Sequence, residues 1–188
     1  MNVRGGNDTA AAAPRDDDLV ARVLAGDREC YSDLVRRYQD ELYRYACGMG
    51  VEHDAALDLV QDAFLRAYVS LKRCRDRRRF RVWLFRILRN RCLDYFRSAE
   101  RRGVPLDSAA LRVDAEVDAF ELSAALDRAF AALPPLLREA FLLYHRDGFA
   151  YDEISELAGV SVSAIKMRVH RAREALRDSL QAAEVTGV

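Results

Sequence analysis

A glycine between two helical patterns near the C-terminus is the feature that most restricts the fold. Apolar residues at helical spacing precede Gly159 in D-E-I-S-E-L-A-G, residues 152–159. The following V-S-V-S-A-I-K-M-R-V-H-R-A-R-E-A-L, residues 160–176, repeats apolar residues at steps of four, three and four: Ile165, Val169, Ala172 and Leu176. Glycine often takes the left-handed conformation that ends a helix, and Ser161 or Ser163 can cap the next helix. The pattern therefore predicts two helices joined by a short turn.

The second of these helices carries its cations away from its apolar stripe. They are Lys166, Arg168, Arg171 and Arg173. This layout is typical of a helix-turn-helix whose second helix enters the major groove of DNA. Taken alone, the stretch also fits a helical hairpin with a solvated basic face.

The net charge of zero conceals two basic segments. Residues 64–104 contain 14 Lys and Arg against 3 Asp and Glu, a net charge of +11. Residues 161–177 contain five bases and one acid, whereas 1–63 and 105–128 carry net charges of −6 and −4. Charge concentrated in this way favours nucleic-acid binding, which the overall neutrality would hide.

Helical periodicity without β-type alternation predicts an all-α fold of two small domains. In the first half we expect helices at about 16–26, 28–49, 54–71 and 80–98, with a charged loop or helix end at 72–79. Between 54 and 71, the side chains expected to face inward are Leu59, Val60, Phe64, Ala67, Tyr68 and Leu71.

Composition divides the chain further. Residues 103–119 lose aromatic side chains and gain acids, which indicates a flexible acidic linker. A second helical unit then begins near Phe120, breaks at Pro134 and Pro135, and resumes at 136–144. The predicted organisation is an N-terminal tail, a first domain, a linker, a helix-turn-helix domain and a C-terminal tail at 1–15, 16–102, 103–119, 120–180 and 181–188.

Several classes of function lack their sequence features. The four cysteines form no C-x-x-C pair and do not cluster with the three histidines, so buried thiols are expected instead of a metal site or disulfides. No P-loop, HExxH, nucleophile elbow or paired-carboxylate pattern occurs, and His170 has no catalytic partners, so neither an enzyme nor a cofactor is predicted. Without a signal peptide or an apolar span, a cytoplasmic protein that does not insert into membranes is expected.

Three stretches together resemble one known family. They are D-A-A-L-D-L-V-Q-D-A-F-L-R-A-Y (54–68), F-R-V-W-L-F-R-I-L-R-N-R-C-L-D-Y-F-R (80–97) and the segment 133–177, which begins L-P-P-L-L-R-E-A-F. In this order they resemble bacterial sigma factors of the sigma-70 superfamily, in the two-domain extracytoplasmic-function class. The resemblance covers residues 16–180. It implies a specificity subunit of RNA polymerase whose partners are core RNA polymerase, promoter DNA and an anti-sigma factor, with no small-molecule substrate.

The resemblance also implies a docking surface for core polymerase on 54–68. The positions that match are Asp58, Gln61, Asp62 and Arg66. Leu57 stands where the family usually has an acidic residue, and an exposed leucine there can pack on a partner. An ordinary solvated helix face is the alternative for these polar positions.

Opening of the −10 promoter element is the role implied for 72–97. This role needs cations for the DNA backbone and aromatic residues that capture unstacked bases. The candidates are Arg77, Arg78, Arg79, Arg81, Trp83, Phe85, Arg86 and Asn90. Trp83 and Phe85 fit the core equally well, and the apolar residues around them are expected to be core.

Recognition of the −35 element is the role implied for 161–173. Base contacts are predicted for Ser163, Lys166, Met167, His170 and Arg171, and phosphate contacts for Arg168 and Arg173. Met167 replaces a small polar residue common in the family, which suggests an altered −35 preference. The acidic linker resembles the family's connector in the RNA path of the polymerase, although an ordinary spacer has the same composition.

Two further expectations concern the free protein. It should bind DNA weakly, with the acidic N-terminal half masking the basic segments. The alternative function is a stand-alone dimeric helix-turn-helix regulator, but no heptad run is present and the basic cluster at 72–97 would be left without a role.

Overall fold

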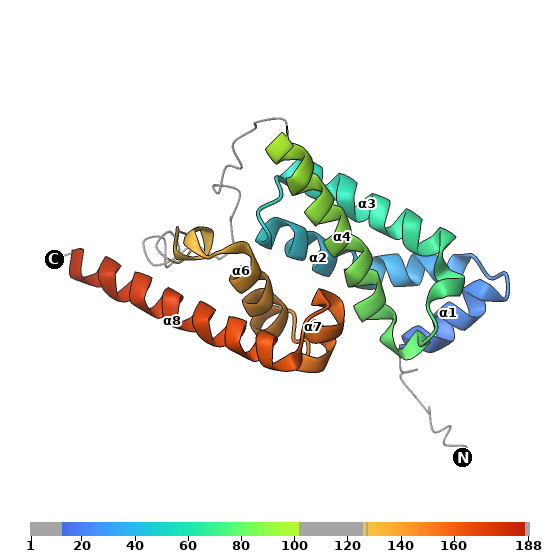
Figure 1. Cartoon of the computed structure of the whole chain (residues 1–188). Coiled ribbons are helices and arrows are strands. Elements are labelled where there is room, and N and C mark those ends of the chain that lie inside the picture. Colours follow the sequence, from blue (N-terminus) through green and yellow to red (C-terminus); the bar gives the residue numbers. More distant parts are fainter. Residues whose placement is uncertain (1–12, 102–125, 127, 187–188) are drawn as a thin grey trace, which may run out of the picture.

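The first helical unit is a bundle of four α-helices. The structure, a computed structural model, describes residues 13–101, 126 and 128–186 (Figure 1). In chain order the first unit contains α1 (Asp16–Leu24), α2 (Glu29–Gly48), α3 (His53–Val69), the 3₁₀ turns η1 (Leu71–Arg73) and η2 (Arg77–Arg79), and α4 (Phe80–Arg101). The charged stretch 72–79 thus contains short turns between two α-helices, as its composition predicted.

The second unit contains the helix-turn-helix. Residues 128–132 are helical, and α6 (Pro135–Phe141), the π-helical turn η4 (Leu142–Arg146), α7 (Tyr151–Ala158) and α8 (Val162–Thr186) follow. Pro135 opens α6 at a position where a helix needs no N–H donor. The described residues contain no strand, which confirms the all-α class. The predicted linker 103–119 and the predicted helix start near Phe120 lie outside the described residues.

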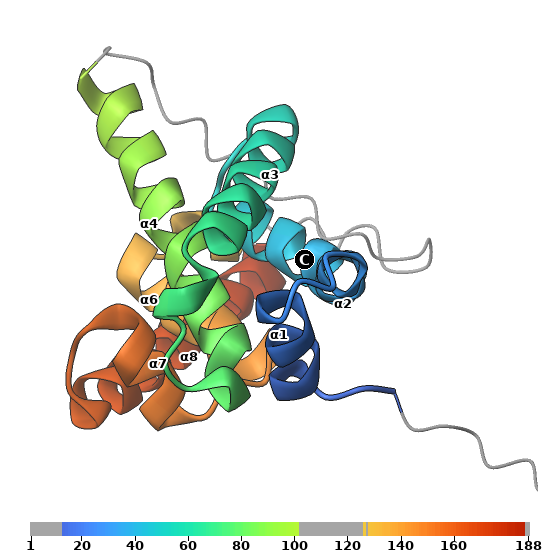
Figure 2. The same ribbon diagram turned by 90° about the vertical axis from the view of Figure 1, so that its right-hand side faces the viewer.

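The two units pack directly against each other. One apolar core runs from Leu19 and Leu42 in the first bundle to Leu143, Phe149 and Ile154 in the second unit. Both views place α7 beside α4 (Figures 1 and 2). A smaller core beneath α8 joins Ala129 and Leu133 to Ala172 and Leu176. The face of α4 that carries several predicted DNA contacts therefore lies next to the second unit.

Candidate nucleic-acid and partner-binding surfaces

The turn between α7 and α8 is built as the sequence predicted. Gly159 ends α7 with φ of 70°, the left-handed conformation that favours glycine. The Ser161 hydroxyl then accepts a hydrogen bond from the Ala164 backbone N–H at 3.3 Å, which caps α8. Ile165 and Val169 are buried beneath the helix. The core therefore fixes which face of α8 points outward.

The outward face of α8 presents nearly all of the predicted −35 residues. Ser163, Lys166, Met167, His170, Arg171 and Arg173 are exposed, and Arg168 is half-buried. Met167 is 50% exposed although it is apolar. An exposed methionine on a basic helix can contact a binding partner without disturbing the core.

His145 of η4 supports one end of this face. The Arg173 guanidinium donates to His145 Nε2 at 3.2 Å, and the His145 ring lies 4.4 Å from that of Phe141. Burial, followed by the positive charge of Arg173, lowers the pKa of His145 below its ordinary value. The imidazole therefore accepts the hydrogen bond as a neutral group at neutral pH.

Aromatic residues on α4 differ in their accessibility. Phe85 is fully buried between Tyr45, at 5.4 Å between ring centroids, and Phe149, at 4.8 Å. Phe85, predicted as a possible DNA contact or core residue, is therefore not accessible in this conformation, because the second unit covers the side of α4 that a single bundle would leave open. Trp83 is half-buried, 6.0 Å from Phe80, and Asn90 is exposed.

Three of the predicted −10 arginines donate side-chain hydrogen bonds to carboxylate or carbonyl oxygens. Arg79 donates to Glu156 at 2.5 Å and to Asp152 at 3.1 Å, and Arg86 donates to Glu156 at 2.8 Å. Arg81 forms an ion pair with Glu41 and also donates to the Asp147 carbonyl. Its guanidinium carbon lies 3.8 Å from the centroid of the Phe149 ring.

The acids that mask α4 come from both units. Glu41 belongs to α2, in the acidic N-terminal half that was expected to mask the basic segments. Asp152 and Glu156 belong to α7 in the second unit. The remaining two predicted arginines, Arg77 and Arg78, are exposed, with Arg78 3.7 Å from Asp17. The expectation of masking by the N-terminal half is therefore incomplete, because α7 supplies much of the opposing charge.

A buried ion pair joins the units at the centre of their contact. The Arg89 guanidinium of α4 donates to Glu139 of α6 at 2.5 and 3.1 Å, and the Tyr45 hydroxyl donates to the same carboxylate at 2.8 Å. Glu139 is only 2% exposed. Burial, followed by the charge of Glu139, raises the pKa of Tyr45 well above its ordinary value, so the phenol keeps its proton. Glu139 and Tyr45 were not predicted, because no local pattern links residues so far apart in sequence.

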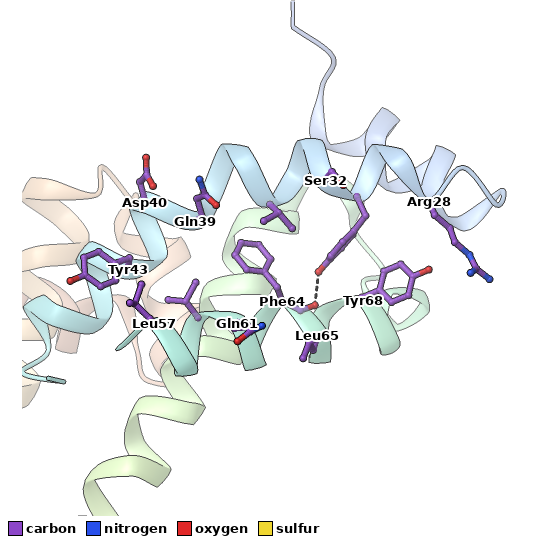
Figure 3. A pocket seen from close by; sticks show the side chains of 13 residues that line it. Arg28, Ser32, Gln39, Asp40, Tyr43, Leu57, Gln61, Phe64, Leu65 and Tyr68 are labelled. Atoms are coloured by element: carbon purple, nitrogen blue, oxygen red, sulfur yellow. Dashed lines mark hydrogen bonds between the residues drawn. The ribbon is translucent and has the colours of Figure 1, made fainter. Parts of the chain in front are cut away.

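An open apolar groove lies between α2 and α3. Its volume is about 670 Å³, and Figure 3 shows Leu57, Leu65 and Tyr68 along the α3 side. Leu57 is 51% exposed, Leu65 61% and Tyr68 38%, so these side chains are available to a partner. The Tyr31 hydroxyl donates to the Phe64 carbonyl at 2.6 Å and ties the two helices together beneath the groove. Tyr68 was expected to face inward, but it lies at the rim against Tyr31.

The polar docking residues predicted on α3 fall into two groups. Asp58 and Gln61 are exposed, and Gln61 lines the groove. Asp62 instead accepts hydrogen bonds from Arg66 at 2.8 Å and from Arg91 of α4 at 2.5 Å. Burial works to raise the pKa of Asp62, but these two arginines outweigh it and hold the pKa below its ordinary value. Asp62 therefore connects α3 to α4, a structural role that the sequence pattern did not indicate.

The cysteines, all of which lie among the described residues, give no further candidate site. All four cysteines are free thiols, and Cys30, Cys74 and Cys92 are buried. Burial is the main cause that raises the pKa of Cys74 to about 11 and that of Cys92 to about 12, so these thiols remain protonated and unreactive. Among the described residues, no helix combines the length and apolar character that a membrane span requires.

Both helical units match known sequence families. Residues 34–102 match Sigma-70 region 2, and residues 123–176 match Sigma-70, region 4. A two-unit helical chain with these regions in this order belongs to the sigma-70 class of transcription initiation factors. The extracytoplasmic-function (ECF) RNA polymerase sigma factor SigW of Bacillus subtilis is 32% identical over 179 residues, which cover 86% of this chain and 95% of SigW. The chain is therefore a member of the ECF sigma factor family.

Two solved structures share its architecture. CnrH, in complex with the cytosolic domain of CnrY, superposes with a TM-score of 0.68 at 29% identity, covering 89% of this chain and 97% of CnrH. RpoE of Bartonella quintana, in complex with the anti-sigma factor NepR, gives a TM-score of 0.65 at 27% identity, covering 80% and 96%. The similarity extends over both units.

Proposed function

We propose that this sigma factor binds core RNA polymerase through the α2–α3 groove and directs initiation at specific promoters. It acts as a non-enzymatic subunit: residues 72–97 open the −10 element, and α8 recognises the −35 element. One observation carries this proposal. A single chain combines an open groove lined by exposed apolar side chains on its first unit with an exposed basic helix-turn-helix on its second. The groove suits a protein partner and the helix suits DNA.

The two DNA-binding roles differ in chemistry. On α8, Lys166 and Arg171 can make bidentate contacts with base edges, while Arg168 binds a backbone phosphate. On α4, the arginines hold the backbone of the opened strand, and Trp83 offers a face for a base. Each DNA-contact surface is small. Because both surfaces are held on one polymerase, binding of the first promoter element raises the effective concentration of the second element at its own surface.

An anti-sigma factor is a further proposed partner. Support comes from the relatives: CnrH and RpoE were solved with CnrY and with the anti-sigma factor NepR, respectively. An anti-sigma factor that covered Leu57 and Leu65 would compete with core polymerase for the groove. Its binding would thereby hold the sigma factor out of transcription.

The decisive experiment is transcription in vitro with purified core polymerase on a library of genomic promoters. We expect a defined subset of promoters to start only when the protein is added. Failure to bind core polymerase, with binding to palindromic DNA as a dimer instead, would identify a stand-alone helix-turn-helix regulator and refute the proposal.

A pair of substitutions on α3 tests the groove itself. Leu65→Asp places a charge where a partner would bury a leucine, and burial of such a side chain contributes about 1.5–3 kcal/mol. We therefore expect affinity for core polymerase to fall roughly tenfold to a hundredfold, because each 1.4 kcal/mol is a factor of ten. The dissociation constant is measured with fluorescently labelled protein.

Val69→Asp is the matched control for this test. Val69 is 85% exposed on the same helix but does not line the groove. Its substitution should leave core binding nearly unchanged. An equal loss of affinity in both variants would show that the groove is not the docking site.

A further inference from the structure

A row of aromatic rings runs beside α8 in the second unit. The ring centroids of Phe130 and Phe141 are 5.3 Å apart, and the His145 ring lies 4.4 Å from that of Phe141. Tyr144 lies 4.8 Å from His145 and stacks on Tyr151 at 4.3 Å, with an angle of 11° between the two ring planes. Phe130 and Phe141 pack against the small core beneath α8, so the core that orients this helix also anchors one end of the row.

Two basic side chains of α8 end at rings of this row. The Lys166 ammonium lies 5.7 Å from the centroid of Tyr151, and the Arg173 guanidinium donates to His145 Nε2 at 3.2 Å. A guanidinium group contains only donors, so Nε2 must be the acceptor in this hydrogen bond. The His145 imidazole is therefore neutral, with its proton on Nδ1.

Arg173 differs from Arg86 of α4 in the charge of its partner. Arg86 is paired with the carboxylate of Glu156, whereas within the described part of the chain no carboxylate forms an ion pair with Arg173. A carboxylate cancels the positive charge of the arginine that it binds. A neutral imidazole instead fixes the direction of the side chain through one hydrogen bond and leaves the charge and the other N–H donors available.

An arginine that is already held in place binds a phosphate more tightly. A free arginine side chain samples many rotamers and loses this freedom when it binds. A side chain fixed beforehand in the bound direction loses less, so the same contact gives a higher affinity. The His145 ring is itself fixed between Phe141 and Tyr144, which are both half-buried.

We propose that His145 is a positioning residue for −35 recognition, and that its Nε2 holds Arg173 in the direction in which Arg173 binds a backbone phosphate. His145 lies in η4, 28 residues before Arg173 and outside the helix that contacts DNA. It acts through Arg173 and makes no DNA contact of its own. This inference rests on the proposed −35 role of α8 and adds a residue to it.

The test measures binding of promoter DNA by the holoenzyme. Core polymerase is combined with each full-length variant, and fluorescence anisotropy gives the apparent dissociation constant for a labelled duplex of a promoter that the wild type transcribes. His145→Ala should weaken binding about twofold to tenfold, the range expected for one hydrogen bond. Arg173→Ala should weaken binding at least as much, because it removes the phosphate contact itself.

Two replacements at position 145 separate the acceptor from the packing of the ring. His145→Gln keeps an acceptor, its side-chain carbonyl, and should restore most of the affinity that His145→Ala loses. His145→Leu fills the same space without an acceptor and should bind as weakly as His145→Ala. Circular dichroism during thermal unfolding should show that all of these variants are folded.

A double-mutant cycle then tests whether His145 acts through Arg173. When Arg173→Ala is already present, adding His145→Ala should cause no further loss, because no guanidinium is left to hold. Equal losses with and without Arg173 would overturn the inference. Wild-type affinity in either alanine variant would also overturn it, as would equal affinities of His145→Gln and His145→Leu.

Failure of the inference can be separated from failure of the proposed function. If the wild-type holoenzyme initiates transcription but substitutions at positions 145 and 173 act independently, the positioning role alone is wrong. If the wild type neither binds core polymerase nor initiates, the proposed function is wrong and the inference falls with it.

Discussion

The arginines of α4 and the basic residues of α8 have similar composition but opposite surroundings. On η2 and α4, Arg79, Arg81 and Arg86 are held by Glu41, Glu156 or backbone carbonyls. On α8, no carboxylate among the described residues pairs with Lys166, Arg168 or Arg171. One basic surface is neutralised by its neighbours and the other faces solvent.

This difference shows that basic sequence alone does not make a surface available to DNA. Availability depends on where the acids of other elements lie once the chain is folded. Under the proposed function, the free protein presents its −35 helix while its −10 arginines are occupied. The groove between α2 and α3 is also open in this form.

The largest expected effect comes from removing the acid at the centre of the contact. Glu139→Ala leaves Arg89 without its partner and Tyr45 without an acceptor. Breaking a buried ion pair in this way costs about 3–5 kcal/mol. We expect urea denaturation, followed by circular dichroism, to show a lower midpoint or a new early transition as the second unit detaches.

Glu156→Ala is the control at the edge of the same contact. Its partners Arg79 and Arg86 have side chains that are each 38% exposed, so solvent screens the pairs. Exposed pairs of this kind contribute about 0–1 kcal/mol. If Glu139→Ala and Glu156→Ala had the same free energy of unfolding, the buried Arg89–Glu139 pair would not be the contact that holds the two units together.

An intermediate effect is expected on the surface that is already open. Arg171→Ala should impair promoters according to their −35 sequence, because a bidentate contact with the correct base contributes about 1–3 kcal/mol of discrimination. Transcription from a set of promoters with single −35 substitutions measures this. Arg168→Ala should lower transcription from all of these promoters by the same factor, because it contacts phosphate. If Arg171→Ala also lowered transcription from all of them equally, Arg171 would be a phosphate contact.

Much of the fold could be predicted from local pattern. Gly159 and Pro135 mark helix ends for reasons of backbone geometry, and the stripe of Ile165, Val169 and Leu176 is buried as its period predicted. Phe85 could not be placed in the same way. A helix covered on two sides has no single apolar stripe, and the second covering of Phe85 comes from Phe149 in the other unit, far away in sequence.

The candidate surfaces could be predicted only in part. The exposure of α8 follows from the periodicity of one helix, so its residues could be identified from sequence. Leu65 on the groove has the same chemistry as a core leucine, and sequence does not distinguish the two. Arg89 and Glu139 are single charges among many, and only the packing of the two units selects them as partners.

The smallest expected effect concerns the ion pair that links α3, which lines the open groove, to α4, whose arginines are paired with acids. Asp62 of α3 accepts from Arg91 of α4, and with its carboxylate 35% exposed this pair is worth about 0.2–1 kcal/mol. Because the pKa of Asp62 is lowered in the folded state, its contribution is present above its unfolded value, about 3.9, and is lost as pH falls through the folded value. Asp62→Asn should therefore lower the free energy of unfolding by about 0.5 kcal/mol at pH 7. The difference should disappear in strong acid, and a constant difference down to pH ~3 would show that the amide perturbs packing instead.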